Sequence, residues 1–160
     1  MKSIRRKVHM ETFYRILVFL HIFSAIVGIG PGFVLTTITK FAKTLPQIRY
    51  AHFVKLKVHV LVMVGGTIVL LTGLTMGALK PVLFQQGWYL TSMILYLIGL
   101  ALGPTLLKKH SRAIKEILDD PSLEELPPEY YESSRKLLKL EYLVNTALII
   151  VIILMITKPF

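Results

Sequence analysis

Four long apolar runs constrain this sequence more than any other feature, because each is long enough to cross a lipid bilayer. They cover residues 13–38, 58–79, 88–107 and 140–157. A bilayer core needs about 20 helical residues, whereas a spanning β-strand needs only about half as many. The runs are continuous rather than alternating, which excludes a membrane barrel. We therefore predict an all-α integral membrane protein, a four-transmembrane-helix bundle that forms a single domain over residues 1–160.

The composition favours the same class of protein. The chain is 54% hydrophobic, above the usual apolar share of a soluble domain. Its formal net charge is +10, and the basic residues gather at the edges of the apolar runs. We interpret them as contacts to a bilayer with anionic head groups and not to nucleic acid. The sequence contains no cysteine, which excludes disulfides and thiolate metal sites.

The connections between the runs differ in length and charge. A link of about eight residues joins the second and third runs, which must form a tight antiparallel hairpin. The segment 108–139 is the longest polar loop and begins with a basic amphipathic stretch that Pro121 breaks. We predict that residues 129–139 continue as a helix into the fourth span. Loops 39–57 and 108–139 hold twelve of the 19 Lys and Arg residues, which favours a cytoplasmic location for both. Four basic residues among the first seven argue for the opposite orientation.

Small residues recur at a spacing of four in three of the runs. The pairs are Gly28 and Gly32, Gly73 and Gly77, and Gly99 and Gly103. Helices in lipid associate through close backbone contact at small residues, so we predict that these faces pack the bundle. The fourth run has no such pair, which places the predicted packing core among the first three spans. The same faces would suit a second copy of the chain, a membrane partner protein or a flat cofactor.

Four polar side chains in or beside the runs need an explanation. His21 lies roughly 12 Å into the first run at about 1.5 Å per residue, and is the foremost candidate to bind a metal or haem iron. Its alternative role is a buried imidazole that is hydrogen-bonded within the bundle. His59 is a second cofactor candidate at a different depth, so we expect that the two histidines do not share one iron. We predict that Glu141 pairs with Lys or Arg, and that Asn145 bonds to a neighbouring helix.

The segment 20–32, LHIFSAIVGIGPG, resembles the first span of a group of small bacterial four-helix membrane proteins. This group is similar to copper-resistance protein D and to HemJ-type protoporphyrinogen oxidase. The resemblance implies a bacterial cytoplasmic membrane, and haem bound through a first-span histidine, which is His21 here. The methionines form no clustered thioether motif for copper.

Two functional hypotheses follow from these features. The first is a small haem-binding membrane protein with a redox or haem-pathway role through His21. The second is a non-enzymatic transport component, or an accessory or assembly subunit, held together by its glycine-rich helix faces. The sequence contains no nucleophile–base triad, phosphate loop or zinc motif. It does not decide whether the protein is an enzyme.

Overall fold

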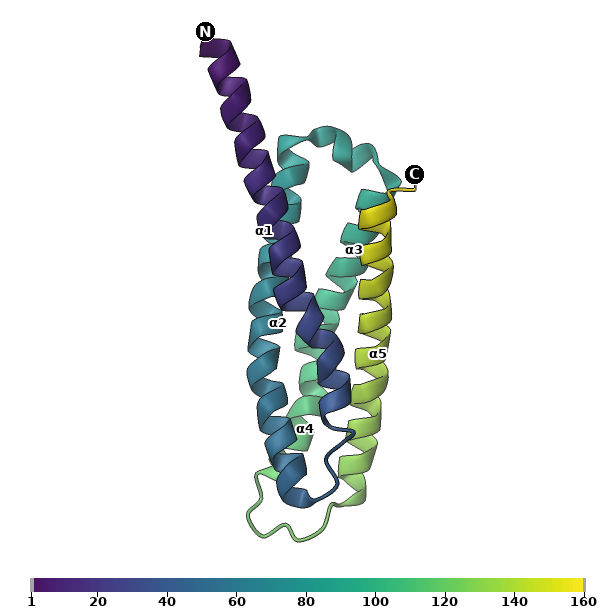
Figure 1. Cartoon of the computed structure of the whole chain (residues 1–160). Coiled ribbons are helices and arrows are strands. Elements are labelled where there is room, and N and C mark those ends of the chain that lie inside the picture. Colours follow the sequence, from purple (N-terminus) through teal and green to yellow (C-terminus); the bar gives the residue numbers. More distant parts are fainter. Residues whose placement is uncertain (1, 160) are drawn as a thin grey trace.

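Four long helical segments run up and down beside one another in the computed structural model, which describes residues 2–159 (Figure 1). Each segment contains a stretch that is apolar and long enough to cross a membrane. The predicted all-α, four-helix membrane fold is therefore confirmed. The principal helices are α1 (Lys2–Ile38), α2 (Leu45–Leu79), α3 (Gly87–Leu102), α4 (Lys108–Leu118) and α5 (Pro128–Thr157).

The third span continues beyond the bilayer-spanning length as a helix. Between α3 and α4 lies one π-helical turn, η2 (Gly103–Leu107), so the helical path from α3 to α4 is unbroken. Pro104 stands in this turn and has no N–H for the normal helical hydrogen bond, which accounts for a local change of helix type. A short 3-10 helix, η1 (Pro81–Gln85), makes the short connection between α2 and α3 that the sequence predicts. The two helices that it joins do not form a tightly packed hairpin, because α3 packs mainly on α5.

The alternating direction of the four segments gives the bundle two distinct ends (Figure 1). Both chain termini and η1 lie at one end, which we call the terminal end. Residues 39–44 and 119–127 lie at the other, which we call the loop end. The first turns of α1 project beyond the rest of the bundle at the terminal end.

The helices at the loop end are longer than the apolar runs, which corrects the predicted extent of two loops but confirms the helical continuation of residues 129–139 into the fourth span. Helix α2 begins at Leu45, so the first connection is residues 39–44 and not 39–57. Pro46 stands in its first turn, and Gln47 Oε1 accepts hydrogen bonds from the N–H groups of Lys43 and Thr44 at 2.9 and 3.2 Å. The segment 108–139 is likewise mostly helical, and only residues 119–127 lie between α4 and α5.

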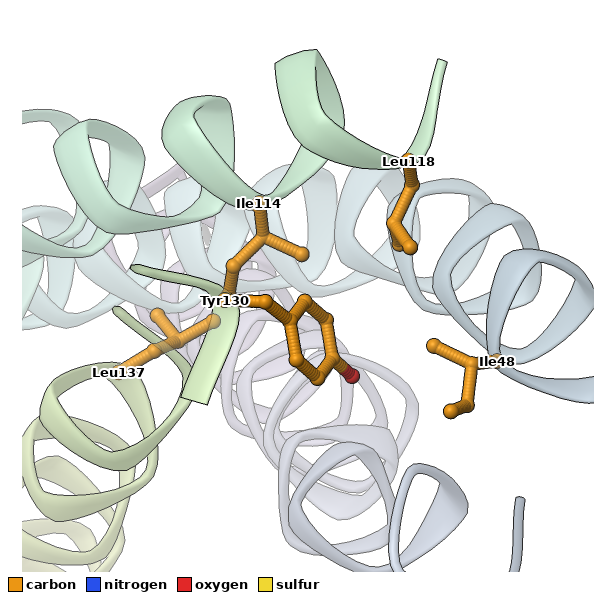
Figure 2. Close-up of a cluster of buried hydrophobic side chains, with 5 residues drawn as sticks. All are labelled: Ile48, Ile114, Leu118, Tyr130 and Leu137. Atoms are coloured by element: carbon orange, nitrogen blue, oxygen red, sulfur yellow. The ribbon is translucent and has the colours of Figure 1, made fainter. Parts of the chain in front are cut away.

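A compact apolar core lies at the loop end, outside the predicted position among the first three spans. Its buried side chains come from α2, α4 and α5, with the Tyr130 ring among the four aliphatic residues (Figure 2). Helix α4 reaches this core because its apolar residues fall on one face. Glycine spacing does not predict this core, because it forms from apolar side chains of α4 and of the adjoining parts of α2 and α5. The core consists of Ile48, Ile114, Leu118, Tyr130 and Leu137.

At membrane depth the bundle is built from two helix pairs, since α1 packs mainly on α2 and α3 packs mainly on α5. A smaller apolar cluster of Ile29, Val69 and Tyr96 joins them, and it lies among the first three spans, where the sequence predicts a packing core. The outer surface is strongly apolar, with Phe19 68% and Ile156 75% exposed. Such a surface would aggregate in water and is the natural boundary with lipid.

Candidate functional site

His21 lies between the first two spans, where a threonine fixes its ring. Its Nδ1 atom is 2.8 Å from the Thr72 hydroxyl, and that hydroxyl donates its proton to the Ile68 carbonyl at 2.6 Å. In the neutral tautomer that carries its proton on Nδ1, the imidazole donates to the threonine oxygen. This tautomer leaves the lone pair of His21 on Nε2, the nitrogen available to a metal or a proton.

A glycine of α2 lies beside this histidine, and two tyrosines of α3 bond to glycine carbonyls of α2. A Cβ atom on Gly73 would lie 3.4 Å from His21 Cε1, so glycine leaves room for the ring. From α3, the Tyr89 hydroxyl donates to the Gly73 carbonyl at 2.9 Å, and the Tyr96 hydroxyl donates to the Gly66 carbonyl at 2.7 Å. These two hydrogen bonds connect α3 to α2, and through α2 to the pair that α2 forms with α1.

A buried serine belongs to the same face of α3 as the two tyrosines. Ser92 is fully buried, and within the described residues its hydroxyl has no hydrogen-bond partner. It lies three residues after Tyr89 and four before Tyr96, which places all three on one helical stripe. On α1, Ser24 is also buried, one turn after His21. Polar side chains thus occupy the interior of the bundle at membrane depth.

A second polar cluster lies near the loop end. The Lys55 ammonium is 2.7 Å from one Glu141 oxygen and 3.0 Å from the other, and the two side chains are only 9% and 14% exposed. This ion pair joins α2 to α5. His59 lies one turn further along α2. Glu141 therefore neutralises a cation that would otherwise be buried alone.

His52 lies one turn before this ion pair and is almost fully buried. Its Nε2 atom has no hydrogen-bond partner among the described residues. The side chain lines a cavity of about 10 Å³, room for a single water molecule. Tyr130 and Ser134 of α5 line the same cavity. A water held there would satisfy the imidazole.

The two predicted cofactor histidines are far apart. His21 is level with Thr72, which follows His59 by thirteen residues on the same helix. At about 1.5 Å per residue this separation is about 20 Å, which excludes a single iron bound by both. Among residues 2–159, no group of three or more His, Asp and Glu side chains is placed to hold a metal ion.

The predicted packing glycines differ in their surroundings. A Cβ on Gly28 would lie 2.8 Å from the Gly65 backbone, so α1 and α2 touch there. The Tyr89 hydroxyl and the Phe84 ring fill the space beside Gly77. A Cβ atom on Gly99 would make ordinary contact with Val144, whose nearest atom is at 3.8 Å. A Cβ atom on Gly103 would have no neighbour within 4 Å.

The last two predicted residues face each other across α1 and α5. A Cβ on Gly32 would have the Asn145 Oδ1 atom at 3.9 Å as its nearest neighbour. Asn145 thus lies toward α1, one turn beyond Glu141 on α5.

Several residues of both clusters were not anticipated from the sequence. Thr72 and Gly65 were not singled out, although the Gly65–Gly66 pair in a span signals close helix contact. Lys55 falls within the loop that the sequence predicts over residues 39–57. The Thr44-to-Gln47 spacing with Pro46 marks an earlier helix start, which would have extended α2 and placed Lys55 on its buried face.

Comparison with known protein families gives a match that covers most of the chain. A family model described as a predicted integral membrane protein (DUF2269) matches residues 15–159. This match includes all four spans and both polar clusters. No curated protein and no solved structure matches the chain. The chain belongs to the DUF2269 family of integral membrane proteins.

Proposed function

We propose that this protein binds haem in the membrane, with His21 as an axial ligand and a redox or haem-pathway role. One observation carries the proposal: His21 Nδ1 lies 2.8 Å from the Thr72 hydroxyl, whose proton has an acceptor in the Ile68 carbonyl. This contact suits the tautomer with its proton on Nδ1, which leaves the Nε2 lone pair free. Histidines that ligate metals characteristically donate their other ring N–H to an oxygen, which fixes the tautomer and the ring orientation. The resemblance of residues 20–32 to proteins similar to HemJ-type protoporphyrinogen oxidase adds support, and implies a bacterial cytoplasmic membrane.

The donor set fits a haem with one protein ligand. His52 and His59 lie toward the loop end, His110 opens α4, and His9 lies on the first turns of α1. None of these four is level with His21. Bound haem would supply one-electron chemistry. The residues of the chain would orient the ligand through Thr72 and leave room for its ring at Gly73.

The test is an absorption spectrum of the detergent-purified protein from haem-replete cells. We expect a Soret band that His21→Ala abolishes. Thr72→Val removes the acceptor at nearly constant volume, and we expect it to weaken haem binding about tenfold or more. His59→Ala is the matched control and should retain the band. Colourless wild-type protein, or a band unchanged in His21→Ala, would refute the proposal.

A second candidate is a non-enzymatic transport component, or an accessory or assembly subunit, that associates through its glycine faces. The observation that favours it is the open space beside Gly103 on the third span, where a Cβ atom would have no neighbour within 4 Å. A partner helix approaching there meets no side chain at this glycine.

We expect Gly103→Leu to weaken association of the purified protein in mild detergent, measured by cross-linking and light scattering. Gly30→Leu is the control, because Gly30 also has open space but lies on α1. A wild-type protein that is monomeric and captures no membrane partner would remove the basis for this candidate. Equal effects of the two substitutions would also argue against a specific face.

A further inference from the structure

A cleft at the terminal end has the composition of an anion-binding site. It has a volume of about 400 Å³ and lies where the projecting first turns of α1 pass the last turn of α2. This volume is within the usual range for small-molecule sites. It is lined from α1 by Lys7, Glu11, Tyr14 and Arg15, and from the end of α2 by Lys80.

The charge in this cleft is predominantly positive. Lys7, Arg15 and Lys80 contribute three cations, and Glu11 contributes one anion. One cation is held in place, because the Lys80 ammonium lies 3.8 Å from the centre of the Tyr14 ring. Arg and Lys together suit a phosphate group, which offers several acceptor oxygens and at least one negative charge.

The depth of the cleft identifies the source of the phosphate. Leu79 ends the apolar run of α2 and Lys80 follows it, so the cations lie where the hydrocarbon gives way to head groups. Met10 and Leu79 also line the cleft and are 58% and 36% exposed. A ligand that is anionic at one end and apolar at the other matches both parts of this surface.

We propose that this cleft binds the phosphate head group of an anionic phospholipid, with Lys7, Arg15 and Lys80 on the phosphate. The acyl chains lie against the apolar side formed by Met10 and Leu79. This inference does not depend on haem or on His21, which lies deeper in the bundle. It assigns one specific lipid site at the terminal end, beyond the general attraction of basic residues to the membrane.

The experiment measures the thermal unfolding of the full chain in a neutral detergent. Phosphatidylglycerol is titrated in, with phosphatidylcholine and inorganic phosphate as separate arms. A ligand that binds only the folded state raises Tm with concentration. We expect phosphatidylglycerol to raise Tm saturably, and the other two to have little effect. An equal rise with inorganic phosphate would overturn the lipid assignment, and no rise with either would overturn the site.

Substitutions then locate the site on the protein. Lys80→Gln or Arg15→Gln should lower the apparent affinity for phosphatidylglycerol about fivefold each. Lys158→Gln is the matched control, because Lys158 also follows a span at the terminal end and lies 5.5 Å from the Trp88 ring. It should leave the affinity unchanged. Equal losses for Lys80→Gln and Lys158→Gln would show general surface attraction and overturn the site.

A substitution that is expected to raise the affinity separates the effect on binding from a loss of folded protein. Glu11→Gln removes the one anion of the cleft and retains the shape of the side chain. We expect the affinity for phosphatidylglycerol to rise severalfold. An unchanged or lower affinity would contradict the proposed phosphate position.

Discussion

Individual charged residues in this protein have very different energetic roles, set by their burial. Lys55 and Glu141 form an ion pair with little exposure to solvent, whereas Lys136 and Glu132 pair on the outside of α5 with side chains 52% and 59% exposed. Removal of one partner of a buried pair leaves a charge without compensation. Exposed pairs on one helix contribute little, because water screens them.

Glu141→Gln should therefore destabilise the protein by about 3 kcal/mol, because Lys55 keeps its charge in a buried site. The matched control, Glu132→Gln, should cause little measurable change. Unfolding of the purified protein in mixed detergent micelles gives both values. The double substitution Lys55→Met with Glu141→Leu should recover most of the loss. Equal losses for the two single substitutions would show that the buried pair has no special role.

Asp120 allows a prediction about pH in the loop between α4 and α5. The Ser122 hydroxyl and N–H donate to its carboxylate at 2.6 and 2.9 Å, and these bonds lower the pKa of Asp120. A lowered folded-state pKa contributes stability that is present at neutral pH and is lost as pH falls through that pKa. Ser122→Ala should raise the pKa of Asp120 toward its ordinary value, measured by carboxyl NMR. An unchanged pKa would show that the hydroxyl bond is absent in solution.

At the scale of helices, the two ends of each span are stabilised by different forces. Within the membrane, α1 and α2 meet at glycines, where the backbones come into direct contact. At the loop end, α4 turns Ile114 and Leu118 toward α2 and α5, as an amphipathic helix does in a soluble protein. Arg49 adds to this contact, because its guanidinium donates to the Leu118 carbonyl at 2.9 Å and so caps the end of α4.

Gly65→Ala should push α1 and α2 apart. A Cβ at this position would lie 2.5 Å from the Gly28 Cα atom, and neither backbone has space to move without cost. We expect a loss of about 1–3 kcal/mol in unfolding free energy. Gly30→Ala is the control on α1, where the Cβ has no neighbour within 4 Å and alanine favours the helix. A neutral Gly65→Ala would show that the helices are further apart.

At the scale of the whole molecule, the two ends of the bundle carry different amounts of positive charge. The segments at the loop end, residues 39–57 and 108–139, hold twelve Lys and Arg, and the remaining seven lie toward the terminal end. The positive-inside rule then favours the loop end on the cytoplasmic side. The structure adds that this end also holds the Tyr130 core and the buried ion pair.

The absence of cysteine allows a direct test of this orientation. We expect a membrane-impermeant maleimide to label Gln86→Cys at the terminal end from outside intact cells. Thr44→Cys at the loop end should react only after the membrane is permeabilised. The reverse pattern would invert the topology, and the four basic residues near the start of the chain would then explain it.

The sequence by itself determined the four spans, the tight link around Pro81 and the all-α class, because the length and continuity of apolar runs are local properties. It also identified His21 and Glu141, since ionisable groups in or beside such runs stand out. The loop-end helices were recognised only in part, because the spans were defined by apolarity and a helix continues wherever its hydrogen bonds are satisfied. The partners of these residues depend on long-range packing. Only the tertiary structure paired His21 with Thr72 and Glu141 with Lys55.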